Sequence, residues 1–316
     1  MVRPRRVATT ALIGSGATVT GFYGFLIGEA VLARRAIGTT EARPPSPDGV
    51  YGDDLPGRSI RLLVIGDSAA VGYGMTSADA TPSAMLGIGL AHVLDAPVEV
   101  RCHAVVGAQT SDLMAQIDLA ADWEPQVTVI VVGTNDVTHQ VPPNTSARLL
   151  GDVVRRLVAL DCEVVVGTTP DLGSVRPIMQ PLRAVARRWS RNLARKQTIA
   201  VVGAGGRAVS LGDLLGNLFT ENRDVMFGVD HFHPSETGYA NMVSVLVPAV
   251  AASLREKAQT LAYAGYQISE HSRPRDLMSV RDAAAEAAEN AGTQVVQDDP
   301  RGGGRWATVL RRRRAG

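Results

Sequence analysis

Two motifs far apart in the sequence hold residue types that nucleophilic catalysis requires. Gly66-Asp67-Ser68 directly follows the apolar run 60–65. A serine at a tight strand-to-helix turn can be held exposed at the edge of a sheet, as a nucleophile must be. Asp230-His231-Phe232-His233-Pro234 supplies an imidazole to accept the serine proton and a carboxylate to orient it. His231 competes for this role, but the spacing to Asp230 and the following Pro234 favour His233.

Two further motifs could supply hydrogen-bond donors to a developing negative charge. Gly107 follows the apolar run 98–106, and a glycine lets the backbone N–H approach a ligand closely. Gly133-Thr134-Asn135-Asp136 follows the run 127–132, and the Asn135 amide could project into the same space. Each motif alone also has a plain structural interpretation, because Gly, Asp, Ser and Asn are common in turns and as helix caps.

A regular alternation of strands and helices positions these motifs. Near-continuous apolar runs predict buried parallel strands at 60–65, 98–106, 127–132, 163–166 and 199–202. The segments between them predict helices at about 82–95, 110–121, 145–160 and 178–197, with a closing helix at about 235–257. This alternation predicts a doubly wound, flavodoxin-like three-layer α/β/α fold with a mostly parallel five-stranded sheet in the order 2-1-3-4-5. In such a sheet the active site collects at the carboxyl ends of the strands.

The four motifs, in this order, resemble those of the SGNH (GDSL-type) hydrolases, which act on esters. The resemblance covers roughly residues 59–257, and its most specific parts are the Asp-x-x-His-Pro and Gly-x-Asn-Asp motifs. Ala69 stands where the motif that names the family has Leu, and the motif around Gly107 is looser than usual.

The resemblance implies a role for each candidate residue. Ser68 is then the nucleophile, His233 the general base and Asp230 the carboxylate that holds the imidazole. The oxyanion hole consists of the backbone N–H groups of Ser68 and Gly107 and the side-chain amide of Asn135. No metal and no organic cofactor are required.

The resemblance leads us to expect a serine-dependent hydrolase of carboxylic esters with short-to-medium acyl chains. Its expected partner is a small-molecule or lipid ester, and it is expected to be a monomer. One alternative is an acyltransferase or deacetylase that acts on an envelope glycan or lipid with the same residues. A second alternative is a non-catalytic envelope protein in which the fold serves binding.

The N-terminus has the pattern of a secretory signal or an uncleaved membrane anchor. Arg3, Arg5 and Arg6 are followed by 22 uncharged residues from Val7 to Gly28, which is long enough for a helix to cross a bilayer. The pattern predicts a location in a bacterial-type cell envelope, exported or anchored, with membrane contact through this segment. The alternatives are an N-terminal helix packed on the domain and a cytoplasmic location.

Composition shifts divide the chain into four parts. Residues 1–37 are the signal or anchor segment, 38–58 a Pro- and Gly-rich linker, and 59–266 the hydrolase domain. Residues 267–316 are predicted to be a disordered tail with a basic C-terminus, since 301–316 holds six arginines and no acid.

The composition also excludes several classes of function. The net charge of +1 and the low aromatic content of 4% argue against a nucleic-acid binder. The two cysteines, Cys102 and Cys162, form no C-x-x-C motif, and in the expected strand order they lie about 14 Å apart, too far for a disulfide. The histidines outside the Asp-His-Phe-His-Pro motif lack metal-ligand spacing, so no metal site is expected; they are His92, His103, His139 and His271.

Overall fold

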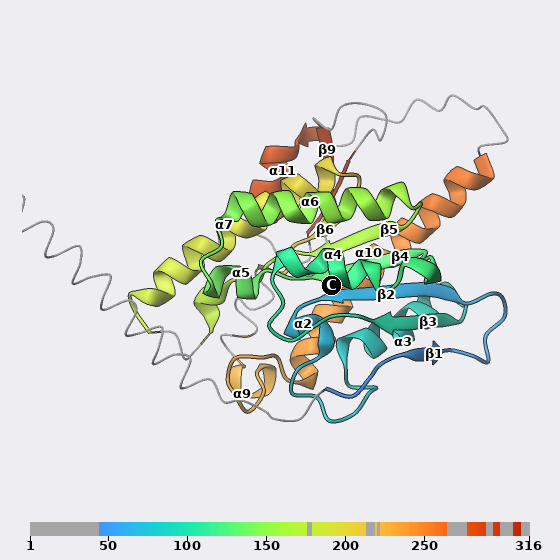
Figure 1. The fold of residues 1–316 in the computed structure, drawn as a ribbon, viewed down its shortest axis with the longest axis horizontal. Coiled ribbons are helices and arrows are strands. Elements are labelled where there is room, and N and C mark those ends of the chain that lie inside the picture. The colour runs from blue at the N-terminus through green and yellow to red at the C-terminus, as the bar shows by residue number, and fades with distance from the viewer. Residues whose placement is uncertain are drawn as a thin grey trace, which may run out of the picture.

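The structure is a computed structural model that describes residues 44–175, 179–212, 219, 222–263, 277–288, 293–297 and 306–310. These residues form helices on both faces of one mixed sheet, as expected for an α/β fold (Figure 1). The predicted signal or anchor segment, residues 1–37, lies outside the described residues.

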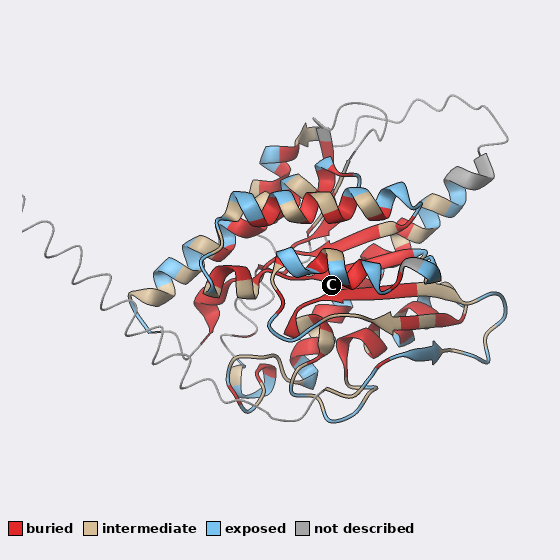
Figure 2. Cartoon of the chain, viewed as in Figure 1, coloured by how far each residue is buried: buried red, intermediate tan, exposed pale blue. Residues whose placement is uncertain are grey.

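Five parallel strands form the centre of the sheet. Their spatial order is β3 (Val98–Cys102), β2 (Ile60–Gly66), β4 (Val127–Val131), β5 (Glu163–Gly167) and β6 (Arg207–Val209). Successive side chains of β2 enter opposite hydrophobic clusters: Leu62 and Val64 enter one, and Leu63 and Ile65 enter the other. Both faces of the strand are therefore buried (Figure 2), which explains its near-continuous apolar sequence.

The sheet is larger than the five strands that the sequence predicted. Among the described residues it has nine strands, four of them outside the parallel centre. At one edge, β1 (Gly49–Tyr51) pairs antiparallel with β3. At the other edge, β8 (Gln294–Gln297), β9 (Trp306–Leu310) and β7 (Leu277–Ser279) continue antiparallel from β6. These added strands pair backbone groups that a five-stranded sheet would leave open at its edges.

Two segments outside the predicted hydrolase domain contribute these strands. β1 lies within the predicted linker 38–58, and β7, β8 and β9 lie within the predicted disordered tail 267–316. The expectation of linker and disorder is therefore wrong for these stretches, because each pairs with the sheet. The domain limits themselves stay a prediction.

Helices cover both faces of the sheet. One face packs against α4 (Leu113–Asp118), α6 (Pro143–Ala159), α7 (Leu182–Gly203) and α11 (Val280–Ala287). The opposite face packs against α3 (Pro82–Leu94) and α10 (Glu236–Tyr263). Short helices lie in the connecting loops: α2 (Ser68–Val71), α5 (Thr134–Thr138) and α9 (Arg223–Met226).

Two predicted strands differ from the observed ones. Residues 199–202, predicted as the last parallel strand, form the end of α7, and the strand is β6 instead. A four-residue apolar run fits a buried helix turn as well as a strand, and Val201 and Val202 are fully buried here. The predicted strand 98–106 stops at Cys102, since Val105 and Val106 are exposed in the loop that follows.

The helix α10 packs against one face of the sheet as part of the hydrophobic core. By length and composition, Glu236–Gln259 could cross a membrane. In this fold, however, Leu246 and Val250 are fully buried in the cluster beneath the sheet. The apolar character of α10 is therefore accounted for by packing.

The two cysteines lie at the ends of strands that are not neighbours in the sheet. Cys102 ends β3 and Cys162 precedes β5, with β2 and β4 between these two strands, and both are free. Burial raises the pKa of the Cys162 thiol to about 11, so this thiol stays protonated at neutral pH.

Candidate active site

The turn that carries Ser68 is shaped by a glycine at the end of β2. Gly66 has φ of +141°, and a Cβ there would lie 1.9 Å from the Val131 carbonyl oxygen on β4. Only glycine fits this close approach. Asp67 then donates its backbone N–H to Val131 O at 3.0 Å and caps α2 by accepting the Ala69 N–H at 2.9 Å. Ser68 is thereby fixed as the first residue of α2.

A buried glutamine braces the same turn. Gln116 of α4 accepts the Gly66 N–H on Oε1 at 2.8 Å and donates from Nε2 to Gly66 O at 3.0 Å. Gly66 O also accepts the N–H of Val105, from the loop that leads to Gly107. Gln116 is 3% exposed, so its two hydrogen bonds meet little competition from water. One side chain thus pins the residue two positions before Ser68.

The imidazole of His233 joins Ser68 to Asp230. His233 Nε2 lies 3.1 Å from Ser68 Oγ, and Nδ1 lies 2.6 Å from Asp230 Oδ2. Both distances are within hydrogen-bond range. His231 is exposed and has φ of +54°, and the structure places His233, not His231, beside the serine.

Contacts from several elements hold the His233 ring. The Tyr73 ring lies 4.3 Å and the Phe232 ring 5.0 Å from it, centroid to centroid. The loop that carries it is tied to the end of α9, since the Gly228 N–H donates to His233 O at 2.9 Å. The imidazole therefore has little freedom to turn away from the serine.

Two carboxyl groups near the imidazole have opposite pKa shifts. Burial by itself raises the pKa of Asp230, but the hydrogen bonds from the His233 ring and from the N–H groups of Phe232 and His233 outweigh it, so this pKa is lowered. Asp230 is then ionised at neutral pH, as an orienting carboxylate must be. Burial raises the pKa of Asp67 to about 6, although the Ala69 N–H and the charge of His233 oppose the rise.

The two predicted oxyanion donors outside the nucleophile turn are linked to each other. Gly107 is exposed, has φ of +85°, and has open space where a side chain would project. Asn135 follows β4 at the start of α5, and its amide Nδ2 donates to Ala108 O at 3.0 Å. The second Nδ2 hydrogen of this amide has no acceptor among the described residues and can donate to a ligand. No hydrogen bond among the described residues joins Gly107 or Asn135 to Ser68.

The chain is similar in sequence to known ester hydrolases. Residues 64–240 match the sequence model of the GDSL-like lipase/acylhydrolase family. The chain is also 38% identical over 258 residues to the GDSL-like esterase Rv1075c of Mycobacterium tuberculosis, a match that covers 78% of this chain and 82% of that one. The chain belongs to the GDSL-like lipase/acylhydrolase family.

One solved structure illustrates the fold of this GDSL-like hydrolase. It is LAE5, an alpha/beta hydrolase enzyme from the metagenome of Lake Arreo, Spain. The TM-score is 0.51 at 17% identity, and the match covers 61% of this chain and 95% of LAE5. At this identity the likeness shows the α/β fold alone.

A second glutamine of this GDSL-like hydrolase braces the turn before Asn135. Gln197 of α7 is fully buried, donates from Nε2 to Val132 O at 3.1 Å and accepts the Thr169 N–H at 2.8 Å. It therefore ties the end of β4 to the end of β5. The adjacent Gly133 has φ of +131°, and a Cβ there would lie 2.0 Å from Thr169 Oγ1.

Neither Gln116 nor Gln197 is predicted from the sequence as part of the site. Each occupies an apolar stripe of its helix, between Leu113 and Ile117 in α4 and between Leu193 and Val201 in α7. A polar residue on a buried helix face is a usable signal, because such a group must find a partner inside the protein. The partners are backbone groups of distant strands, which the sequence pattern cannot identify.

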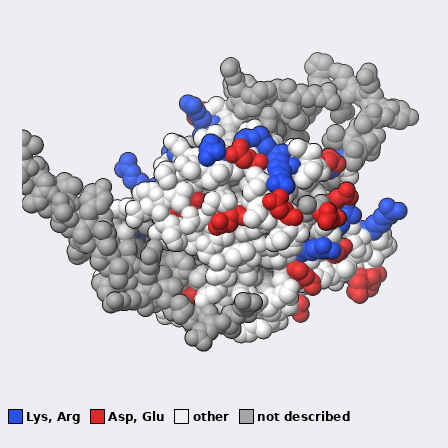
Figure 3. Space-filling model, viewed as in Figure 1, with Lys and Arg blue, Asp and Glu red and all other residues white. Residues whose placement is uncertain are grey.

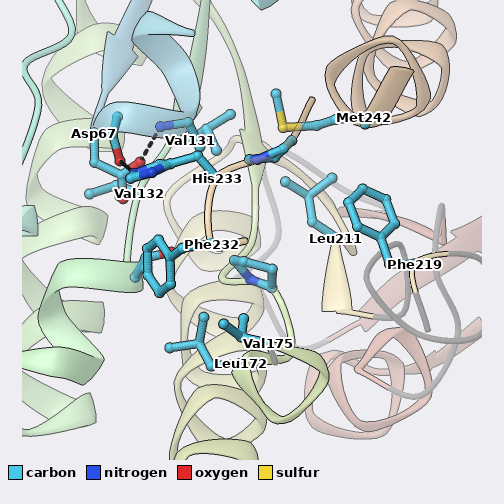
Figure 4. Close-up of a pocket in the computed structure, with 16 residues that line it drawn as sticks. Asp67, Val131, Val132, Leu172, Val175, Leu211, Phe219, Phe232, His233 and Met242 are labelled. Atoms are coloured by element: carbon cyan, nitrogen blue, oxygen red, sulfur yellow. Dashed lines mark hydrogen bonds between the residues drawn. The ribbon is translucent and has the colours of Figure 1, made fainter. Parts of the chain in front are cut away.

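A small apolar cavity lies beside Ser68 and His233 (Figure 4). Its volume is about 60 Å³. In Figure 4, Leu172, Val175 and Phe232 lie on one side of it and Leu211, Phe219 and Met242 on the other. Asp67 lies next to His233. Oδ2 of Asp67 has no hydrogen-bond partner among the described residues. The described residues contain no group of three or more His, Cys, Asp or Glu side chains placed to hold a metal ion.

Proposed function

We propose that this GDSL-like hydrolase cleaves carboxylic esters with Ser68 as nucleophile, His233 as general base and Asp230 as the orienting carboxylate. The observation that carries the proposal is the continuous line from Ser68 Oγ through His233 Nε2 and Nδ1 to Asp230 Oδ2, with separations of 3.1 and 2.6 Å. A serine is a weak nucleophile at its ordinary pKa and needs an adjacent base. The family and the 38% identical esterase support the same activity.

The reaction proceeds in two acyl-transfer steps. Ser68 Oγ attacks the ester carbonyl while His233 Nε2 accepts its proton, and the alcohol leaves as His233 returns that proton. Water then attacks the acyl-enzyme with His233 again as base, and the carboxylic acid is released. Asp230 remains ionised throughout and stabilises the imidazolium, consistent with its lowered pKa.

The tetrahedral intermediate needs donors on the side of Ser68 away from His233. We assign the backbone N–H groups of Ser68 and Gly107 and the Asn135 amide to this role. The open space at Gly107 and the second Nδ2 hydrogen of Asn135 are compatible with it. One such donor typically stabilises the transition state by about 3 kcal/mol.

The apolar cavity supports a preference for short acyl groups. A water-sized sphere occupies roughly 10–15 Å³ of such a cavity, so about 60 Å³ holds only a few heavy atoms. Its lining is mainly aliphatic and aromatic, which suits an acetyl to butyryl chain rather than a polar one. We therefore propose small esters as the preferred substrates.

The catalytic assignment is tested with matched histidine variants. Ser68→Ala and His233→Ala should each lower kcat on p-nitrophenyl butyrate by at least about three orders of magnitude. His231→Ala removes an exposed histidine two residues away and should leave kcat unchanged. Far-ultraviolet circular dichroism checks that each variant is folded. Substantial turnover by folded Ser68→Ala, or failure of a serine-reactive organophosphonate to label Ser68, would overturn the assignment.

Export or anchoring by residues 1–37 is a separate proposal. It rests on the uncharged run from Val7 to Gly28 behind three arginines. Asp48 Oδ1 accepts the Cys102 N–H at 2.8 Å, so the stretch around Asp48 lies at the carboxyl end of β3. Fractionation of cells that express the full chain and a variant lacking residues 1–37 tests it: only the full chain should leave the cytoplasmic fraction.

A further inference from the structure

Tyr239, in the first turn of α10, is a fully buried phenol close to the catalytic residues. Its hydroxyl donates to the backbone oxygen of Tyr73 at 3.1 Å. Burial raises the pKa of this phenol well above its usual value, and the charges of Asp67 and Asp230 raise it further. The hydroxyl therefore stays protonated and acts as a donor throughout the physiological pH range.

The backbone of Tyr73, which accepts this hydrogen bond, is also tied to the turn that carries the nucleophile. Tyr73 follows α2, and its N–H donates to Ser68 O at 3.0 Å. The N–H of Gly72 donates to the same oxygen at 3.1 Å. One residue thus has hydrogen bonds to Ser68 through its N–H and to Tyr239 through its C=O.

The side chain of Tyr73 packs on the imidazole of His233. The two ring centroids are 4.3 Å apart, with 45° between the ring planes. On the face drawn in Figure 3, the charged side chains of the described residues gather over α4 and α6, and few lie over α2. The contact between Tyr73 and His233 is therefore one of ring packing, and it limits how far the imidazole can turn.

These contacts close a loop around the reacting pair. Ser68 Oγ lies 3.1 Å from His233 Nε2, the imidazole packs on Tyr73, and the Tyr73 N–H returns to Ser68 O. The Tyr239 hydroxyl ties this loop to α10, which packs in the core on one face of the sheet. A fully buried donor on a core helix is a firm support, because water does not compete for its hydrogen bond.

We propose that Tyr239 is a positioning residue, whose hydroxyl holds Tyr73 so that the Tyr73 ring keeps His233 Nε2 in reach of Ser68 Oγ. This role presupposes the functions proposed for Ser68 and His233. Tyr239 does not line the cavity beside Ser68 and acts only through Tyr73. Proton transfer requires Nε2 and Oγ to lie about 2.6–3.2 Å apart, so a small displacement of the imidazole slows the reaction.

Tyr239→Phe tests the role of the hydroxyl, and Tyr51→Phe is the matched control. The Tyr51 hydroxyl also donates to a backbone oxygen, that of Pro47, at 2.7 Å. Tyr51 pairs with Val98 at the amino end of β3, whereas Ser68 follows the carboxyl end of β2. Each variant thus loses one phenol-to-carbonyl hydrogen bond, but only one of them loses it near the site. Urea unfolding measures the stability of both.

We expect Tyr239→Phe to lower kcat on p-nitrophenyl butyrate by about tenfold with KM little changed, since a displacement of 1 Å costs as much as about a hundredfold in rate. The rate at which a serine-reactive organophosphonate labels Ser68 should fall in parallel, because labelling also needs His233 to accept the serine proton. Tyr51→Phe should change neither rate. Equal kcat in Tyr239→Phe and wild type, or an equal loss of kcat in both variants, would overturn the proposal.

Variants at the half-buried Tyr73 test whether Tyr239 acts through it. Tyr73→Leu removes the ring and should lower kcat, whereas Tyr73→Phe keeps the ring and should retain more of kcat than Tyr73→Leu does. Adding Tyr239→Phe to Tyr73→Leu should lower kcat little further, because the ring that Tyr239 positions is already gone. Losses that multiply fully in the double variant would show that Tyr239 acts by another route and would overturn the proposal.

Failure of the catalytic assignment itself has a different signature. If Ser68 is not the nucleophile, the organophosphonate leaves Ser68 of the wild-type protein unlabelled and Ser68→Ala keeps its activity. If Ser68 is labelled in the wild-type protein and the Tyr239→Phe protein reacts at the same rate, the assignment of Ser68 stands and only the positioning role of Tyr239 is overturned.

Discussion

Replacement of Asp67 by asparagine should stabilise the protein increasingly as the pH rises above about 4. The Asp67 side chain is 1% exposed, and its Oδ2 has no hydrogen-bond partner among the described residues. Burial raises its pKa from 3.8 to about 6, with a further contribution from Asp136. The folded state therefore holds this proton more tightly than the unfolded chain, and ionisation costs folding free energy.

The size and sign of the effect follow from that shift. A difference of about two pKa units corresponds to about 3 kcal/mol in the free energy of unfolding. The contribution of protonated Asp67 is fully present below pH 3.8, declines as the pH rises, and is lost above about pH 6. Asparagine is neutral throughout and can still accept the Ala69 N–H. The variant should equal wild type near pH 4 and exceed it by up to about 3 kcal/mol at pH 8.

Urea unfolding of both proteins from pH 4 to pH 8, followed by circular dichroism, measures this difference. Asp79→Asn, at an exposed position between α2 and α3, is the control and should show no comparable pH dependence. A difference between Asp67→Asn and wild type that stays constant across this pH range would refute the reasoning, because it would mean that Asp67 titrates alike in the folded and unfolded states.

Three further predictions concern the turns around the site. Asn135→Ala should lower kcat by about two orders of magnitude with little change in KM, since it removes a donor that acts on the transition state; steady-state kinetics measures both. Gln116→Leu should cost about 1–3 kcal/mol of stability, because the backbone N–H and C=O of Gly66 lose a buried partner, and it should also lower kcat; urea unfolding and kinetics together test this. Gly66→Ala should prevent stable folding, since its Cβ would lie 1.9 Å from Val131 O; soluble yield and circular dichroism at 25 °C report the outcome.

Three of the parallel strands could be predicted from the sequence with nearly correct ends. The runs 60–65, 127–132 and 163–166 correspond to β2, β4 and β5. Each has helices on both faces and so consists almost entirely of apolar residues. The sequence pattern of these strands is easy to recognise because burial on both faces, and not only β-propensity, determines their composition.

The last parallel strand gave a misleading signal. β6 has three residues and begins with Arg207, whose Nη2 hydrogen-bonds to Glu256 of α10 and whose Nη1 hydrogen-bonds to Gln294 of β8. A buried arginine does not fit the apolar pattern that predicts a buried strand. The run 199–202 does fit that pattern, although it lies in helix α7. The partners that make Arg207 acceptable come from segments more than 40 residues away, so no local pattern could predict them.

The C-terminal strands were missed for a related reason. β7 has three residues and β8 four, too short for periodicity to stand out from the surrounding polar sequence. Their position depends on pairing with one another and with β6. This pairing is long-range information that composition alone does not carry.

The order of the motifs along the chain was a stronger signal than any motif alone. Gly66-Asp67-Ser68 and Gly133-Thr134-Asn135-Asp136 each follow a strand, and parallel neighbours end at the same edge of a sheet. The sequence could therefore predict which residues meet. It could not predict the braces, Gln116 and Gln197, or the pairing of Asp171 with the arginines of α7, because their partners are set by tertiary packing.

The braces show how the two helical layers determine the catalytic geometry. Gln116 comes from α4 on one face of the sheet and fixes the turn of Ser68. His233 precedes α10, which packs on the opposite face. The Ser68–His233 hydrogen bond thus spans the edge of the sheet and joins elements that pack independently. A change of packing under α4 or α10 therefore alters the distance from Ser68 Oγ to His233 Nε2, even where neither Ser68 nor His233 is substituted. A shift of 1 Å between reacting groups lowers the rate by as much as about a hundredfold. The close fit of Gly66 and Gly238 against neighbouring backbone atoms therefore matters for the catalytic rate as well as for the stability of the fold.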